Sequence, residues 1–150
     1  GCYCNRGVSG IEGSLSTAIG AAMAYPEMTV LFTGDMSMAY DVSALSVRDI
    51  PERLKIVVLS NGGGGIFRFI SSTSSLPERE HYFCAPPQLP LPQLAAAYGF
   101  EYYRASSPGE LKQVLPMFFA PRLAPAILEV VTPGEIGGEV LRGYMNRENN

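Results

Sequence analysis

Apolar residues occur along this chain in short, nearly uninterrupted runs separated by helix-like segments. Such runs predict strands buried on both faces, here at 28–32, 54–59, 100–104 and 126–131. Helix-like segments precede the first of them, at 13–25, and separate the others, at 37–47, 94–98 and 107–119. This alternation predicts an α/β fold, a three-layer α/β/α arrangement around a mostly parallel sheet.

Residues that begin or end elements refine these bounds. Gly99 is a predicted C-cap, and Ser107 a predicted N-cap followed by Pro108 at the first helical position. Residues 71–92 are rich in serine and proline and predict a long loop, which in compact domains is usually functional or disordered. From Glu135 onward we predict a polar helix that frays.

The composition narrows the class of protein. The 150 residues fit one domain. The 11 basic and 14 acidic residues give a net charge of −3 without a clustered basic patch, which argues against nucleic-acid or anionic-membrane binding. Nor is there an apolar run of about 18 residues that could span a bilayer.

Cysteine usage and the first residues indicate where the chain belongs. Three irregularly spaced cysteines do not form a disulfide framework and favour reduced thiols in a cytoplasmic protein. The chain opens with glycine instead of an initiator methionine. We therefore expect residues 1–150 to be a fragment of a longer protein.

Residues suited to binding a phosphate and a metal ion follow the strand predicted at 28–32. Gly34 permits a sharp turn, and the N–H groups of Met36 and Ser37 then open a helix whose positive end attracts phosphate. Asp35 stands at the same corner, where its carboxylate would repel a phosphate unless a cation lay between them. Mg²⁺ prefers one or two carboxylates together with phosphate oxygens. The alternative is that Asp35 only caps the helix.

A second group of polar and glycine residues follows the next strand. Asn61 comes 26 residues after Asp35, which is the length of one parallel crossover, so both should reach one edge of the sheet. The Asn61 amide and the carbonyls of Gly62–Gly65 offer oxygen ligands suited to Mg²⁺. Taken alone, the four glycines could also be a flexible loop. The segment 66–70 should form a helical turn.

Gly34-Asp35, followed at this interval by Asn61, resembles the cofactor motif of the thiamine diphosphate (ThDP) enzymes, the superfamily of transketolase, pyruvate decarboxylase and acetolactate synthase. The resemblance implies that Asp35, Asn61 and a backbone carbonyl near Gly63 ligate Mg²⁺ (or Mn²⁺). The motif usually ends in two asparagines, and Ser60 stands in the first place here.

Three stretches carry a narrower resemblance, at 5–13, 34–41 and 61–67, supported by Pro77–Glu80. They are similar to the family of 2-succinyl-5-enolpyruvyl-6-hydroxy-3-cyclohexene-1-carboxylate (SEPHCHC) synthases of menaquinone biosynthesis. The likeness extends from Asn5 to about Val131. It implies the carboxy-terminal, diphosphate-binding domain of such an enzyme.

The resemblance also implies residue roles. Arg6 should hold a substrate carboxylate, which suits the bidentate geometry of a guanidinium. Ile11 should support the bent shape of ThDP. Apolar residues around the thiazolium ring and the substrate should be Ile66, Phe67 and Ile70. The wider cofactor contacts should be Ser9, Gly10, Ile11, Gly34, Asp35, Met36, Ser37, Asn61, Gly63, Gly64 and Ile66.

Each role has a structural alternative. Arg6 could form a surface salt bridge, Ile11 could pack in the core, and the three apolar residues from Ile66 to Ile70 could be helix core.

By this resemblance, the parent enzyme is a ThDP-dependent transferase that decarboxylates 2-oxoglutarate and adds the succinyl-semialdehyde unit to isochorismate. The parent would be a homodimer or a dimer of dimers. No catalytic residue is expected in this domain, because the activating glutamate should come from a different domain of the partner subunit. We therefore expect the isolated domain to fold, to bind Mg-ThDP weakly and to be inactive.

Three other functions share part of this sequence pattern. An acetolactate synthase-like carboligase shares the motif, but the block at 5–13 argues against it. A nucleotide-binding oxidoreductase would need Gly-x-Gly-x-x-Gly, which the spacing of Gly7, Gly10 and Gly13 does not match. A non-catalytic anion-binding module stays open, and Asp35→Ala would change little in it.

Overall fold

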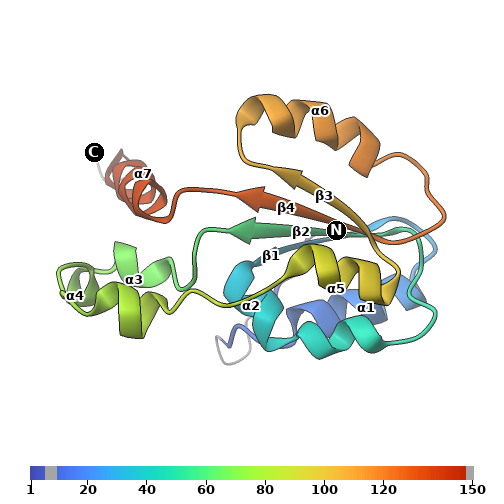
Figure 1. The fold of residues 1–150 in the computed structure, drawn as a ribbon, viewed down its shortest axis with the longest axis horizontal. Coiled ribbons are helices and arrows are strands. Elements are labelled where there is room, and N and C mark those ends of the chain that lie inside the picture. The colour runs from blue at the N-terminus through green and yellow to red at the C-terminus, as the bar shows by residue number, and fades with distance from the viewer. Residues whose placement is uncertain (6–9, 148–150) are drawn as a thin grey trace.

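The computed structural model describes residues 1–5 and 10–147 and contains one four-stranded sheet (Figure 1). All neighbouring strands pair in parallel, in the order β1-β2-β4-β3. The strands are β1 (Thr29–Gly34), β2 (Leu54–Ser60), β3 (Glu101–Ala105) and β4 (Ala126–Val131). The predicted parallel α/β architecture is confirmed.

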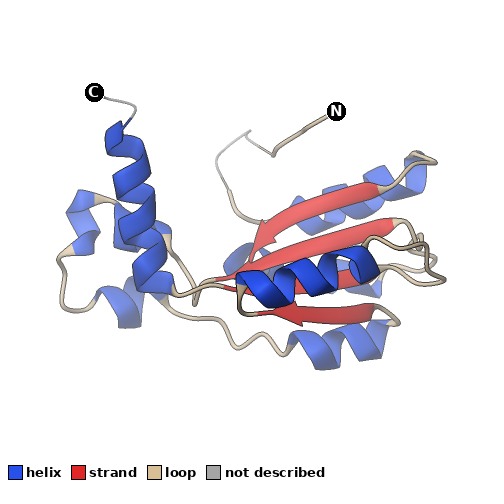
Figure 2. Cartoon of the chain, turned by 90° about the horizontal axis from the view of Figure 1, so that it is seen from above, coloured by secondary structure: helices blue, strands red, loops and turns tan. Residues whose placement is uncertain are grey.

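Helices cover both faces of the sheet, which makes three layers (Figures 1 and 2). On one face, α1 (Ser14–Ala24) packs against β1 and β2, α5 (Leu91–Tyr98) packs against β3 and β4, and the two helices bury the larger apolar core. On the other face, α6 (Pro108–Phe118) covers β3 and β4 and encloses a smaller core around Phe118. The alternation of side chains along β2 supplies both cores, because successive residues point to opposite faces.

Two predicted caps are confirmed. Gly99 adopts the left-handed conformation (φ 75°), and the Phe100 N–H returns to the Ala95 carbonyl at 2.8 Å, which ends α5. The Ser107 hydroxyl accepts the Glu110 N–H at 3.2 Å and starts α6.

The single helix predicted over 37–47 is wrong. The structure has α2 (Asp35–Tyr40) and then a 3₁₀ helix, η1 (Val42–Ser46). The break is at Asp41, whose carboxylate accepts hydrogen bonds from the Ser16 N–H and hydroxyl at 2.6–2.8 Å. This tertiary contact with α1 holds Asp41 outside helical geometry (φ −118°, ψ 17°), which no local pattern reveals.

The long loop predicted over 71–92 is also wrong in part. A short helix α4 (Ser71–Ser74) and a π-helix η2 (Arg79–Cys84) occupy much of it, and α5 begins at Leu91. Side chains close these turns onto backbone carbonyls. Thr73 Oγ1 donates to Phe67 O at 2.8 Å, and Arg79 Nη1 donates to Ser74 O at 2.6 Å. Such contacts depend on neighbours that helical periodicity does not record.

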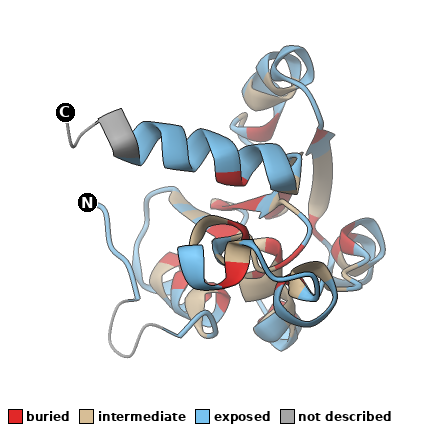
Figure 3. Ribbon diagram, turned by 90° about the vertical axis from the view of Figure 1, so that its left-hand side faces the viewer, coloured by how far each residue is buried: buried red, intermediate tan, exposed pale blue. Residues whose placement is uncertain are grey.

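The helices α3 (Ile66–Phe69), α4 and α7 (Gly134–Arg147) gather beyond the carboxyl ends of the strands, apart from the helices that cover the sheet (Figure 1). The predicted helix near Glu135 is therefore present as α7. Seen from that side, α7 is exposed over most of its surface, with one buried position at Gly138 (Figure 3). Within the described residues, no helix is both long and apolar enough to cross a membrane.

Candidate functional site

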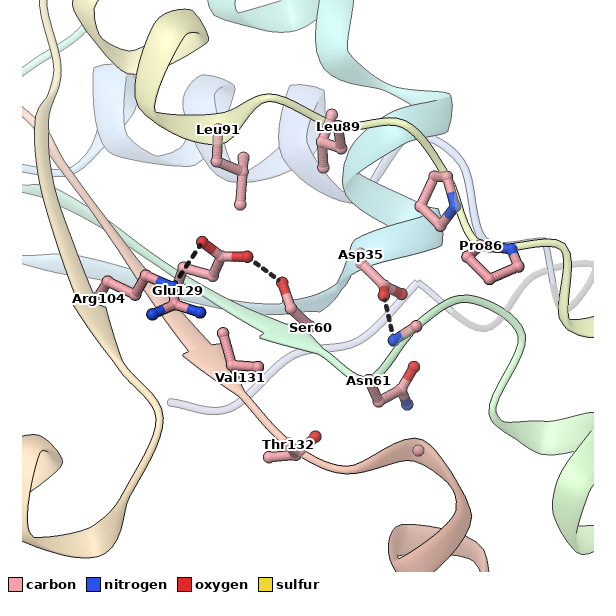
Figure 4. Close-up of a pocket in the computed structure, with 13 residues that line it drawn as sticks. Asp35, Ser60, Asn61, Pro86, Leu89, Leu91, Arg104, Glu129, Val131 and Thr132 are labelled. Carbon is pink, nitrogen blue, oxygen red and sulfur yellow. Dashed lines mark hydrogen bonds and ion pairs between the residues drawn. The ribbon is translucent and has the colours of Figure 1, made fainter.

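The parallel register brings the two predicted ligand-bearing strand ends together. Gly34 at the end of β1 pairs with Leu59 near the end of β2, so Asp35 and Asn61 leave the sheet at the same edge. The predicted juxtaposition is confirmed. Figure 4 shows the Asp35 carboxylate beside the turn that follows Asn61, joined to it by a hydrogen bond.

Asp35 is buried, with 7% of its surface exposed. Its Oδ2 accepts the N–H groups of Gly62 and Gly63, both at 2.9 Å, and its Oδ1 accepts the Met36 N–H at 2.8 Å. Three backbone N–H groups therefore converge on this one carboxylate. Of the two N–H groups predicted for phosphate, that of Met36 is thus directed to Asp35.

The Asn61 side chain, in contrast to the Asp35 carboxylate, has an oxygen that accepts no hydrogen bond from the described residues. Its Oδ1 is buried and has no hydrogen-bond partner among the described residues. An unpaired buried acceptor costs about 1–3 kcal/mol unless something binds it. Asn61 and Asp35 line the same cavity, and an amide oxygen together with a carboxylate fits a hard divalent cation. The Gly63 carbonyl accepts the Gly65 N–H at 2.8 Å and keeps a second lone pair.

Glycine is required in the turn after Asn61 for steric reasons. Gly62 and Gly63 have φ angles of 78° and 100°, in the region that side chains disfavour. A Cβ on Gly63 would lie 2.1 Å from the Cys84 carbonyl oxygen, and one on Gly65 would lie 2.6 Å from Asn61 Nδ2. The turn is therefore packed and specific, which argues against a flexible loop.

Helix α3 buries a charged residue and exposes an apolar one, which is the reverse of the usual pattern. Its one buried residue is Arg68, with 6% of its surface exposed, whereas Ile66 is 61% exposed. Phe67 packs against Phe83 with ring centroids 5.6 Å apart, and Ile70 is half-buried. The alternative of a helix core therefore fails for Ile66, which is free to contact a ligand.

The Arg68 guanidinium reaches back to the turn and across to η2. It donates to Asn61 O and Gly62 O, both at 3.0 Å, and to the two carboxylate oxygens of Glu80 at 3.1 and 2.8 Å. Hydrogen bonds from Arg68, and then from Arg79, lower the pKa of Glu80 to about 2. Sequence reasoning missed Arg68, since an arginine in a four-residue helix carries no periodic signal.

The segment before α1 meets the start of α2. The Ser37 hydroxyl donates to the Ile11 carbonyl, which joins two of the predicted cofactor stretches. Ile11 is 44% exposed, so the alternative of core packing is wrong for it. Arg6 and Ser9 lie outside the described residues.

A cavity of about 450 Å³ opens along the same edge of the sheet, between Asp35 and β3 (Figure 4). Its polar wall includes a second carboxylate missed in the sequence, Glu129 of β4. Glu129 accepts the Ser60 hydroxyl at 2.8 Å and the Tyr102 hydroxyl, and lies 3.9 Å from Arg104. Burial, then the hydrogen bond to Glu129, raises the pKa of Tyr102. This carboxylate is fully partnered by neighbouring strands.

Among residues 1–5 and 10–147, no three His, Cys, Asp or Glu side chains cluster in a way that could hold a metal ion. A cation at this edge would therefore depend on one carboxylate, one amide oxygen and backbone carbonyls. That set of hard oxygen donors fits Mg²⁺ better than a softer metal.

Comparison with known proteins identifies the family. The family described as thiamine pyrophosphate enzyme, C-terminal TPP binding domain, matches residues 2–130. The chain belongs to this family. The match covers α1, β1, β2, β3, all but the last residue of β4, and the turn after Asn61, so it includes both halves of the candidate metal corner. Thiamine pyrophosphate is another name for ThDP.

Several curated relatives are named 2-succinyl-5-enolpyruvyl-6-hydroxy-3-cyclohexene-1-carboxylate synthase. The one from Porphyromonas gingivalis is 45% identical over 144 residues, or 96% of this chain and 25% of its own length. Relatives from Christiangramia forsetii and Flavobacterium johnsoniae are both 40% identical, over 96% and 95% of this chain and 25% and 26% of their own lengths. The chain thus spans about a quarter of the curated relatives it matches.

Proposed function

We propose that this domain binds Mg²⁺ (or Mn²⁺) and the diphosphate of ThDP at the corner formed by Asp35, Asn61 and the glycine turn. The observation that carries the proposal is the buried Asn61 Oδ1, which has no partner among the described residues, in the wall of the cavity that the buried Asp35 also lines (Figure 4). A bound cation would satisfy that oxygen and would neutralise the charge of the diphosphate. The Gly63 carbonyl is the third proposed ligand.

Around this corner, the proposed cofactor contacts are Gly10, Ile11, Gly34, Met36, Ser37, Gly64 and Ile66, with Ser9 from the undescribed segment. Exposed Ile11 and Ile66 offer apolar surface for the rings of the cofactor. Substrate would meet Ile66, Phe67 and Ile70, and the Arg6 guanidinium would bind a substrate carboxylate.

We propose that the parent protein is a ThDP-dependent transferase of the kind its relatives' name describes. It would decarboxylate 2-oxoglutarate and add the four-carbon unit to isochorismate, in the cytoplasm. When bound, ThDP supplies the electron sink for such a reaction. The residues of this chain bind and orient the diphosphate and metal, and their apolar neighbours exclude water from the substrate side.

The parent would be a homodimer or a dimer of dimers, with the activating glutamate on another domain of the partner. It follows that residues 1–150 alone would bind Mg-ThDP weakly and would not turn over substrate.

Two measurements on the full-length protein test the proposal. Calorimetry should show ThDP binding that requires Mg²⁺, and mass spectrometry should detect the SEPHCHC product from 2-oxoglutarate and isochorismate. Acetolactate formed from pyruvate instead would favour the rival carboligase. Diphosphate binding that does not depend on Mg²⁺ or on Asp35 would favour an anion-binding module and would contradict the metal site.

A further inference from the structure

Two consecutive peptide groups in the turn after Asn61 are held from both ends. In the first, the Asn61 carbonyl accepts from Arg68 at 3.0 Å, and the Gly62 N–H donates to Asp35 at 2.9 Å. In the second, the Gly62 carbonyl accepts from Arg68 at 3.0 Å, and the Gly63 N–H donates to Asp35 at 2.9 Å. The turn therefore bridges a buried carboxylate and a buried guanidinium.

This bridging compensates for the freedom of glycine. A run of four glycines loses more conformational entropy on ordering than any other sequence of that length. No side chain in Gly62–Gly65 can anchor the turn, so its shape depends on contacts made by its backbone. Besides Asp35 and Arg68, the main one is the Gly64 N–H donating to the Cys84 carbonyl at 2.7 Å.

Arg68 can be buried next to the turn because its charge is neutralised by Glu80. A buried guanidinium beside a proposed divalent cation would repel that cation and would lose its own hydration. Glu80 takes two of its donors in a bidentate pair, and Arg79 Nε holds Glu80 in turn at 2.9 Å. The remaining donors of Arg68 are thereby aimed at the two carbonyls.

The amino end of α7 closes over this contact. A Cβ added to Gly134 would lie 2.4 Å from Arg68 Nη1 and 2.4 Å from Asn61 O, and one added to Gly138 would lie 3.3 Å from Arg68 Cβ. The guanidinium is thus packed between the turn and α7. This packing restricts the guanidinium to the position from which it donates to the Asn61 and Gly62 carbonyls.

We infer that Arg68, neutralised by Glu80, is a positioning residue that holds the Asn61–Gly63 backbone in the shape that binds the metal. The inference rests on the proposed Mg²⁺–ThDP site. Arg68 touches neither metal nor cofactor in this scheme, and acts through the two carbonyls it binds. Residues that orient metal ligands from outside typically contribute about 10–100-fold in metal affinity.

The test measures Mn²⁺ affinity by electron paramagnetic resonance, with ThDP present, in the full-length protein. We expect Arg68→Gln to weaken Mn²⁺ binding by about 10–100-fold. Arg68→Lys keeps the charge but loses the planar fork, and should recover only part of that loss. Glu80→Gln removes the neutralising charge and should weaken binding in the same direction.

Arg122→Gln is the matched control. Arg122 forms an ion pair with Glu101 at 3.6 Å, at the opposite end of the sheet. Its loss should leave Mn²⁺ affinity unchanged.

The outcomes separate the two proposals. If the unchanged protein does not bind Mn²⁺ with ThDP, the proposed function itself fails. If it binds and Arg68→Gln binds equally well, even at a lower melting temperature, then Arg68 is only structural and the inference is overturned. Should Arg68→Gln not fold, Glu80→Gln and Arg68→Lys decide in the same assay, and unchanged affinity in both would overturn it.

Discussion

Near each end of β2 lies a buried polar atom that has no hydrogen-bond partner within the described part of the chain, and the two atoms differ in their surroundings. At the amino end, Lys55 Nζ lies under α6, 6.0 Å from the centroid of the Phe118 ring, and burial lowers the pKa of this lysine. At the carboxyl end, Asn61 Oδ1 lies in the wall of the cavity that Asp35 also lines, next to the glycine turn.

This comparison indicates which surroundings make an unpaired buried atom evidence for a ligand-binding site. Lys55 lies under the Phe118 ring, and the charges of Glu101, Glu52 and Arg122 act on it without any of them forming a hydrogen bond to its ammonium, so its missing partner is a cost to stability alone. Asn61 has a second oxygen donor, a packed turn and an adjoining cavity, so its missing partner coincides with a place for a cation. The following predictions test that contrast.

The largest effect is expected for Asp35→Ala. Loss of the carboxylate removes the charged ligand of the proposed cation and the acceptor for two glycine N–H groups. Mg²⁺-dependent ThDP binding, measured by calorimetry on the full-length protein, should weaken by more than about 100-fold, or about 2.8 kcal/mol. The control is Asp41→Ala, whose carboxylate binds Ser16. It should cost stability and leave ThDP affinity unchanged.

A smaller loss, of about tenfold or 1.4 kcal/mol in Mg²⁺ affinity, is expected for Asn61→Ala. Because the amide oxygen is unpaired without a metal, its removal should not lower the melting temperature of the metal-free protein. Asn61→Asp keeps an oxygen ligand and should retain affinity, while charge repulsion with Asp35 destabilises its metal-free form. Equal Mg²⁺ affinity for Asn61→Ala and the unchanged protein would remove Asn61 from the site.

At the other end of β2, Lys55→Met should stabilise the protein by about 1–3 kcal/mol in chemical denaturation, because a buried unpaired charge is removed. Since the pKa of Lys55 is lowered on folding, the unfolded chain binds more protons there, and stability should rise with pH towards the usual value of 10.5. Lys55→Met should abolish that rise. Exposed Lys112→Met is the control, with no expected change. A stability loss in Lys55→Met would show that the ammonium has a partner.

The smallest expected effect is on the stability of the protein at acidic pH. The pKa of Glu80 is lowered to about 2, so its pairing with Arg68 stabilises the fold above the ordinary value of 4.5, and that contribution is lost as pH falls towards 2. Glu80 is partly exposed, so solvent reduces the effect. Glu80→Gln should flatten the decline of melting temperature between these pH values. If the melting temperature of Glu80→Gln declined as steeply as that of the unchanged protein, the decline would be due to titratable groups other than Glu80.

Local sequence was sufficient for the strands, the caps at Gly99 and Ser107, and the two strand ends that form the proposed metal corner. Apolar runs and capping residues act through their own neighbours, so they can be recognised along the chain. Arg68, Glu80 and Glu129 could not be recognised in this way. Their partners come from other elements, 12 residues away for the Arg68–Glu80 pair and 69 residues away for Ser60 with Glu129.

The sequence by itself determined that this chain is a parallel α/β domain in which Asp35 and Asn61 meet at one edge, because alternating strands and helices leave parallel crossovers no other arrangement. Only the tertiary structure decided that the glycine turn is rigid and that an arginine is buried behind it. Both features depend on hydrogen bonds between backbone groups and side chains that are far apart in the sequence. Such hydrogen bonds produce no periodic pattern of residues along the chain.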